Sequence, residues 1–214
     1  MTSSALSSIA PYPHFFSSVL TMDDKDLPQV VETLRLWKRY LKYYISINSA
    51  DIATKDLASD FSVVLRLFQK DVGRYKKKEP LIIFIAFDNF KMIQGLACCR
   101  SPEPCSPKVL DINQLLCAPW NIRWKIKPYP YPLHGGGVLL ISAIFKTAQK
   151  AGLSHLWLHS APTSLNFYKK LGMHPSKVNV FTFTLESPSD QEKISQAFFR
   201  AFGSLRPIDS YLNP

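Results

Sequence analysis

The residues with the clearest chemical potential are three consecutive glycines, Gly135 to Gly137, which follow His134. They directly precede an apolar segment with helical spacing that runs to about Lys150. Because glycine has no Cβ, its backbone N–H group can approach a ligand closely. A helix that begins here adds unpaired N–H donors and the positive end of its dipole. The pattern predicts an anion site suited to phosphate, with a flexible turn before a core helix as the alternative.

The four cysteines indicate neither a metal site nor a disulfide. Cys98 and Cys99 are adjacent and cannot easily bridge one another, and the spacing to Cys105 and Cys117 matches no zinc-binding pattern. We therefore expect reduced thiols in a cytoplasmic protein that holds no metal. No motif pairs Cys117 with a base, so the sequence does not predict it as a nucleophile.

The elements that would position these residues follow from hydrophobic periodicity. Apolar residues at intervals of three and four predict helices from Asp26 to about Ile45 and from about Thr54 to Lys77. Further helices are expected from the glycines to Gly152, from a cap at Ser160 to Gly172, and from Asp190 to Ala201. Strands are expected at 81–87, 91–98, 109–118, 153–159 and 178–185, with one more at 14–20 in the N-terminal tail.

This order of elements predicts an α/β fold with a mixed sheet and helices on both of its faces. With 214 residues the chain is expected to form one domain at 23–187. A Ser-rich tail would precede it at 1–22, and a helix with a tail would follow at 188–214. In the strand at 109–118, alternation places Asp111 and Cys117 on one face and Leu116 on the other.

The net charge of +10 implies anionic partners, and nucleic acid, an acidic protein, a membrane surface or a phosphate-rich cofactor would all fit. No apolar run approaches the roughly 20 residues of a membrane helix, and a membrane is not expected among the partners. The oligomeric state is left open.

Three motifs follow one another along the chain. The first is the hairpin at 85–97, the second is Leu115 to Pro119 followed by Gly135 to Leu140, and the third is Asn166 to Met173. In this order they resemble the GNAT superfamily of acyl-CoA-dependent N-acyltransferases. The second motif is similar to the family's fourth strand and pyrophosphate loop, and the third is close to its Tyr-x-x-x-Gly-Phe ending. The resemblance covers about Asp26 to Leu185 and implies a GNAT-like fold.

The sequence departs from the family in the segment that leads to the glycines. Pro132 stands where the family usually has Arg or Gln, and the segment from Pro119 to Gly135 is longer than usual. Basic residues in this segment could supply the missing positive charge or could simply belong to a solvated loop. They are Arg123, Lys125 and Lys127.

The resemblance implies acetyl-CoA, or another acyl-CoA, as the cosubstrate. Pantetheine would lie between the diverging fourth and fifth strands and pair with the backbone of Leu116, Cys117 and Ala118. The pyrophosphate would bind the amides from His134 through Gly135, Gly136 and Gly137 to Val138.

The resemblance also assigns candidate acid and base residues. Tyr168 matches the family's tyrosine that protonates the leaving thiol, although it could also be a core aromatic residue. Asp111 is the first choice for a base, because a half-buried carboxylate has a raised pKa, and the alternative is a surface-facing Asp at the strand end. His159 could serve instead or could simply cap the next helix, and water could relay the proton. The role of His134 could be limited to hydrogen bonding a phosphate.

Two functions from different classes remain at this stage. The first is an N-acetyltransferase that acts on an unidentified amine by direct attack. The second is a non-catalytic module with a GNAT-like fold whose basic surface binds nucleic acid or an acidic protein. The glycine run and Tyr168 favour the enzyme, whereas Pro132 and the net charge favour the module.

Overall fold

The computed structural model describes residues 16–48, 52–100, 108–122, 133–177 and 180–202, and these form one mixed sheet with helices on both faces. The strands follow the spatial order β1-β2-β3-β4-β5-β7-β6. Their bounds are β1 (Phe16–Thr21), β2 (Leu81–Asp88), β3 (Ile93–Arg100), β4 (Val109–Cys117), β5 (His155–His159), β6 (His174–Lys177) and β7 (Val180–Thr184). The helices are α1 (Leu27–Ile47), α2 (Ile52–Lys76), α3 (Gly136–Lys150), α4 (Leu165–Lys170) and α5 (Pro188–Phe202), with short 3-10 turns η1 (Pro119–Asn121) and η2 (Pro162–Ser164).

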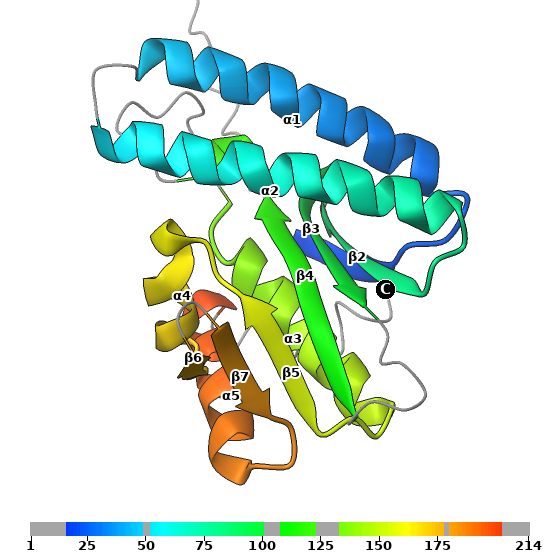
Figure 1. The fold of residues 1–214 in the computed structure, drawn as a ribbon, viewed down its shortest axis with the longest axis vertical. Helices are drawn as coiled ribbons and strands as arrows, with labels where there is room; N and C mark the ends of the chain where they lie inside the picture. Colours follow the sequence, from blue (N-terminus) through cyan, green and yellow to red (C-terminus); the bar gives the residue numbers. More distant parts are fainter. Residues whose placement is uncertain (1–15, 49–51, 101–107, 123–132, 178–179, 203–214) are drawn as a thin grey trace, which may run out of the picture.

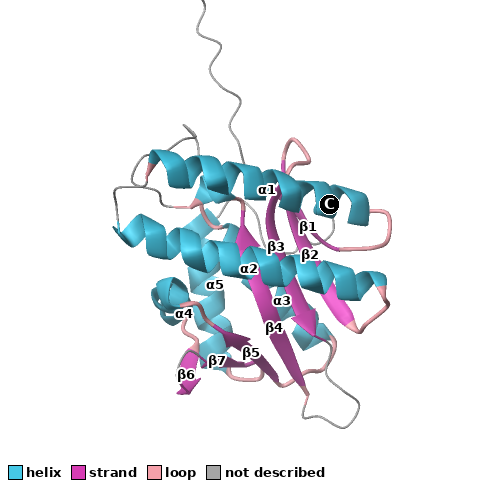
Figure 2. Ribbon diagram, turned by 45° about the horizontal axis from the view of Figure 1, so that its top comes forward, coloured by secondary structure: helices cyan, strands magenta, loops and turns pink. Residues whose placement is uncertain are grey.

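Two helical layers cover the sheet, as Figures 1 and 2 show. The helices α1 and α2 lie side by side across one face, where the α1 residues Leu34, Trp37 and Leu41 are buried at the predicted helical spacing. On the opposite face α3 lies between the sheet and α5, which explains why apolar residues surround most of its circumference. The predicted layers are therefore confirmed for the described residues.

Two elements extend the domain beyond its predicted bounds. β1 lies in the stretch that was expected to be a tail, and it pairs antiparallel with β2 as an edge strand of the same sheet. α5, from the predicted C-terminal segment, packs its Ile194 and Phe198 into the core around α3. The short strand β6 was not predicted, because its four residues are all exposed and carry no apolar alternation.

Two polar residues at predicted helix starts do not cap their helices with their side chains. The Ser160 hydroxyl donates to its neighbour's carbonyl oxygen, that of Ala161, at 2.8 Å, and so does not cap the next helix. Asp26 precedes α1, but its carboxylate accepts from the backbone N–H of Asp23 at 3.0 Å rather than from the helix. Among the described residues, no helix combines the length and apolar character needed to cross a membrane.

The side chains of β4 do not alternate as predicted, because the strand contains a β-bulge. Cys98 of β3 pairs with Gln114, and the next residue, Cys99, pairs with Ile112, so Asn113 is the extra residue. The bulge reverses the alternation after Asp111. Asp111 and Leu116 consequently face the α2 side, whereas Cys117 faces α3, so Asp111 and Cys117 do not share a face.

Candidate functional site

The strands β4 and β5 separate part of the way along the sheet. They pair in parallel only from Val109 and His155 to Ile112 and Leu158. β4 then continues to Cys117 beside β3, while β5 ends at His159 and the chain turns into η2. Figure 1 shows the two strands side by side at their starts and apart at their ends. The separation leaves the outer edge of β4 without a strand partner.

A cavity of about 220 Å³ occupies this separation, and we call it the slot. Its walls come from α2, the end of β4, the start of α3 and the η2–α4 segment. Residues from each wall include Phe61, Leu115, Cys117, Gly137, Thr163 and Phe167. The lining is mostly apolar, which suits a thin, uncharged ligand chain rather than a charged group.

Backbone direction along β4 shows which residues face the slot. The Ala118 N–H group donates to the Gln94 carbonyl oxygen at 2.9 Å, so Ala118 is directed toward the β3 side. Because successive residues of a strand direct their backbone groups to opposite edges, Leu116 also pairs on the β3 side. Cys117 and Leu115 therefore present their N–H and C=O groups to the slot. Leu115 was not among the predicted residues, whereas Leu116 and Ala118, which were predicted, pack on the α2 side and do not line the slot.

The glycine run forms the first turn of α3 at one end of the slot. Gly135 is the N-cap residue, with φ of 92°, a left-handed conformation that favours glycine. The first intrahelical bond runs from Leu139 N–H to the Gly135 oxygen at 2.9 Å, so the three preceding N–H groups have no acceptor within the helix. The Gly137 N–H group is directed at the Cys117 sulfur. His134, immediately before the run, is exposed.

Each glycine of the run lies against an aromatic ring. A Cβ atom placed on Gly135 would lie 2.8 Å from Phe202, one on Gly136 would lie 2.9 Å from Phe16, and one on Gly137 would lie 2.9 Å from Phe167. Real Cβ atoms are essentially never found so close to another side chain. The run is therefore a packed helix start and not a flexible turn.

A polar network holds the start of the run in place. The Asn121 side chain accepts from the Leu133 N–H group at 2.8 Å and donates to the Gln94 side-chain oxygen at 2.9 Å. Gln94 also accepts from the Trp120 indole at 2.8 Å and donates to Asp88 at 2.8 Å. The network thereby joins the β2–β3 turn to η1 and to the residue that precedes His134.

A pair of hydrogen bonds links α2 to η2 at the slot. The Asp60 carboxylate accepts from the Thr163 hydroxyl at 2.7 Å and from its N–H group at 3.2 Å. Both residues line the slot. The contact ties the helical layer to the segment that follows β5.

Tyr168 is buried in α4 near Cys117. Its ring packs against Phe167 at 5.0 Å and Phe181 at 5.8 Å between centroids. Burial raises the pKa of Tyr168 well above its ordinary value, and the nearby Cys117 raises it further. The phenol therefore stays protonated at neutral pH, which is the form that a proton donor requires.

Asp111 and His159 come together in a second cavity of about 500 Å³, which we call the outer cavity. Val64 and Ala161 line both the slot and the outer cavity, so the two adjoin. Burial raises the pKa of Asp111, and the nearby His159 and Arg100 partly oppose this effect. Asp111 precedes Cys117 by six residues, or roughly 20 Å of strand. It therefore lies well away from Tyr168.

Two solved structures superpose on 79% and 81% of this chain. An acetyltransferase of the GNAT family from Staphylococcus aureus Mu50 superposes with a TM-score of 0.50 at 11% identity, over 79% of this chain and 99% of that chain. A GNAT-family protein from Desulfovibrio desulfuricans superposes with a TM-score of 0.50 at 12% identity, over 81% of this chain and 99% of that chain. The chain has the GNAT fold. The sequence itself matches no family model and no curated protein.

The predicted GNAT fold is thus confirmed, while the roles of its residues are a separate matter. At such identities the likeness establishes the fold alone. The structure places Cys117 and Gly137 in the lining of the slot, and it brings Asp111 and His159 together at the outer cavity. Tyr168 lies in the core close to Cys117 and is not one of the residues that line the slot. Pro132, Arg123, Lys125 and Lys127 lie outside the described residues.

Sequence reasoning missed several residues that shape this candidate site. Asn121, Asp60 and Thr163 have partners far away in the sequence, so no local pattern could mark them. Within the described residues, no group of three or more His, Cys, Asp or Glu side chains could hold a metal ion.

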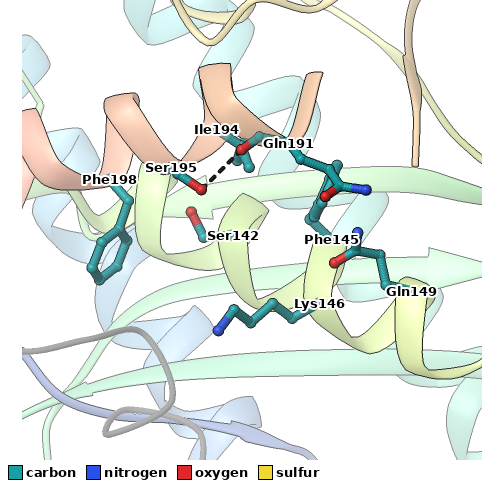
Figure 3. Close-up of a pocket in the computed structure, with 8 residues that line it drawn as sticks. All are labelled: Ser142, Phe145, Lys146, Gln149, Gln191, Ile194, Ser195 and Phe198. Atoms are coloured by element: carbon teal, nitrogen blue, oxygen red, sulfur yellow. Dashed lines mark hydrogen bonds between the residues drawn. The ribbon is translucent and has the colours of Figure 1, made fainter. Parts of the chain in front are cut away.

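A third cavity, of about 220 Å³, lies between α3 and α5, away from the slot (Figure 3). Ser142 points toward α5 there, and its buried hydroxyl has no hydrogen-bond partner among the described residues. The facing Ser195 hydroxyl donates within its own helix to the Gln191 oxygen at 2.9 Å. The cavity contains none of the predicted site residues, so it takes no part in the chemistry considered below.

Proposed function

We propose that this protein is an N-acyltransferase that transfers an acetyl group from acetyl-CoA directly to a primary amine, with Tyr168 as general acid. The observation that carries the proposal is the slot between β4 and β5, which is open along the outer edge of β4 and ends at the first turn of α3, where Gly137 lines it. A pantetheine chain can pair with that edge as an added strand would.

The cosubstrate would be held mainly by backbone groups. The N–H groups of Gly136 and Val138, with the positive end of the α3 dipole, would bind the diphosphate, and the exposed His134 lies beside them. Cys117 and Leu115 would bind the pantetheine amides. Acetyl-CoA supplies the activated acetyl group as a thioester.

The transfer requires two proton movements. The neutral amine attacks the thioester carbonyl carbon, a C–N bond forms, and the C–S bond breaks as the tetrahedral intermediate collapses. Tyr168 donates its proton to the leaving sulfur. The amine loses a proton toward the outer cavity, and the distance along β4 favours water as the relay to Asp111 or His159.

A covalent acetyl-cysteine route is not part of the proposal. Burial raises the pKa of Cys117 to about 12, and the Gly137 N–H group only partly opposes this. A thiol with this pKa supplies almost no thiolate near neutral pH, and thiolate is the nucleophilic form.

Thermal unfolding with and without acetyl-CoA tests the cosubstrate. A ligand at a hundred times its Kd stabilises the folded state by about 2.7 kcal/mol. For a domain of this size we expect Tm to rise by roughly 5–10 °C. An unchanged Tm at millimolar acetyl-CoA would contradict the proposal.

The Tyr168→Phe variant tests the acid. We expect kcat to fall about a hundredfold while the Kd for acetyl-CoA stays unchanged, because only proton donation is lost. Tyr75→Phe is the matched control, since the Tyr75 hydroxyl donates to the Met22 oxygen at 3.3 Å, away from the slot. If Tyr168→Phe lost cofactor binding together with turnover, Tyr168 would have a structural role only.

One observation favours the alternative of a non-catalytic module that binds nucleic acid or an acidic protein. The outer face of α1 exposes three cations, Lys38, Arg39 and Lys42, beside Tyr43, which is 55% exposed. Such a face can bind phosphates and stack on bases. The slot has no role in this alternative.

A further inference from the structure

The charged residues that line the outer cavity indicate what charge an acceptor bound there should have. The cavity adjoins the slot and is formed by α2, the end of β3, β4 and the end of β5. Its charged and titratable residues come from all four elements. They are Lys70, Asp71, Arg74, Arg100, Asp111 and His159.

Two of these charges neutralise each other. Arg74 forms an ion pair with the buried Asp71 at 3.2 Å and also lies 3.7 Å from Glu79. This leaves Lys70 and Arg100, which form no ion pair within the described residues. Only Asp111 opposes them, so the remainder of the cavity is positive even when Asp111 is ionised.

The two cations lie at the rim, while Asp111 lies deeper. Lys70 and Arg100 are exposed, whereas Asp111 is half-buried and pairs with Arg100 across the β3–β4 ladder. A ligand that fits must therefore present an anionic group to the rim. Its uncharged, reactive part can then reach inward past Val64 and Ala161, which the slot and the outer cavity share.

From this arrangement we infer that the acceptor is a small amine that also carries an anionic group, a carboxylate or a phosphate, which binds Lys70 and Arg100. The inference rests on the proposed function and names its substrate class. A cavity of about 500 Å³ holds a small molecule of this kind. Polyamines are excluded as preferred acceptors, because their additional cations would lie beside Lys70 and Arg100.

Matched pairs of amines test this inference. Initial rates are compared for glycine and glycinamide, and for phosphoethanolamine and ethanolamine, with spermidine as a polycation. We expect kcat/KM about tenfold higher for the anionic member of one pair, mainly through KM, because two rim charges act on it. The pair with the larger ratio distinguishes carboxylate from phosphate.

Variants that lack the rim cations test whether Lys70 and Arg100 cause the preference for anionic amines. Lys70→Met and Arg100→Gln should each reduce the ratio of anionic to neutral amine about threefold, and the double variant should bring it close to one. Lys55→Met is the matched control, since Lys55 is an exposed lysine on α2 that does not line the cavity. Ratios near one in the native protein, ratios unchanged in the variants, or spermidine as the best acceptor would each overturn the inference.

Failure of the inferred acceptor class can be distinguished from failure of the proposed transferase function. Isothermal titration measures binding of the same amines without turnover. The rise in Tm with acetyl-CoA measures binding of the cosubstrate at the slot and does not depend on the amine. Loss of the acetyl-CoA effect would reject the transferase. A retained acetyl-CoA effect with no preference for anionic amines in either rate or binding would reject only the acceptor class.

Discussion

At the scale of single residues, the glycine run has two separate physical roles. Gly137 lines the end of the slot, while the Cα atoms of the run lie against Phe16, Phe167 and Phe202. The sequence predicted the first role, because glycines before a helix are a local pattern. It could not predict the second, because the three rings come from distant parts of the chain.

Gly137→Ala tests the packing role. The added methyl group would lie 2.9 Å from a Phe167 ring carbon, so the ring and its neighbour Tyr168 must shift. We expect the free energy of unfolding to fall by about 1–3 kcal/mol, measured by urea denaturation, with a loss of turnover. Gly73→Ala is the control, because nothing lies within 4 Å of its position in α2.

The control should change stability in the opposite direction. Alanine in the interior of a helix is more favourable than glycine by roughly 0.5–1 kcal/mol, so Gly73→Ala should stabilise the protein. If Gly137→Ala were as stable as the native protein, Phe167 would move freely. The close packing at the slot would then not be a constraint.

At the scale of elements, the sequence predicted the type of each segment, helix or strand, more accurately than its pairing and orientation in the fold. Periodicity placed α1, α2, the β2–β3 hairpin and α3 closely, since these segments have long apolar stripes. It failed at β6, which has no buried face, and within β4, where a single extra residue reverses the alternation. The bulge at Asn113 has no signal in an isolated strand, because it is defined by pairing with β3.

The Asn121→Ala variant tests the polar network that holds the start of the glycine run. The Asn121 side chain holds the Leu133 N–H group and Gln94 together. In Asn121→Ala the part-buried Leu133 N–H group loses its acceptor, while the Gln94 oxygen keeps its bond from the Trp120 indole. We therefore expect a loss of about 1–2 kcal/mol in stability. Acetyl-CoA should bind roughly tenfold more weakly by titration calorimetry, since the α3 amides are then less well positioned.

Gln29→Ala is the comparison for Asn121→Ala. Gln29 donates to the Lys91 carbonyl oxygen at 3.1 Å on the surface, so it makes a similar bond without contact to the glycine run. Its removal should leave the Kd for acetyl-CoA unchanged. An equal loss of affinity in both variants would show that the effect is general destabilisation, and that the network does not position the site.

At the scale of the whole molecule, two groups of basic residues have different expected roles. Lys70 and Arg100 lie at the outer cavity, whereas Lys38, Arg39 and Lys42 lie on the outer face of α1. α2 lies between α1 and the slot side of the sheet in Figure 1. The two functions therefore depend on different surfaces and can be altered independently.

Replacing Lys38, Arg39 and Lys42 together by Gln distinguishes the transferase from the binding module. A transferase whose acceptor binds at the outer cavity should keep its kcat/KM, because none of these residues lines the slot or that cavity. A nucleic-acid binder should lose affinity for single-stranded RNA, and its slope of log K against log salt should become shallower by about 2, since each neutralised phosphate contributes roughly 0.7. Filter binding at several salt concentrations, beside the acetyl-transfer assay, measures both. We expect unchanged transfer and weak RNA binding already in the native protein, whereas tight, salt-steep RNA binding without any transfer would favour the module.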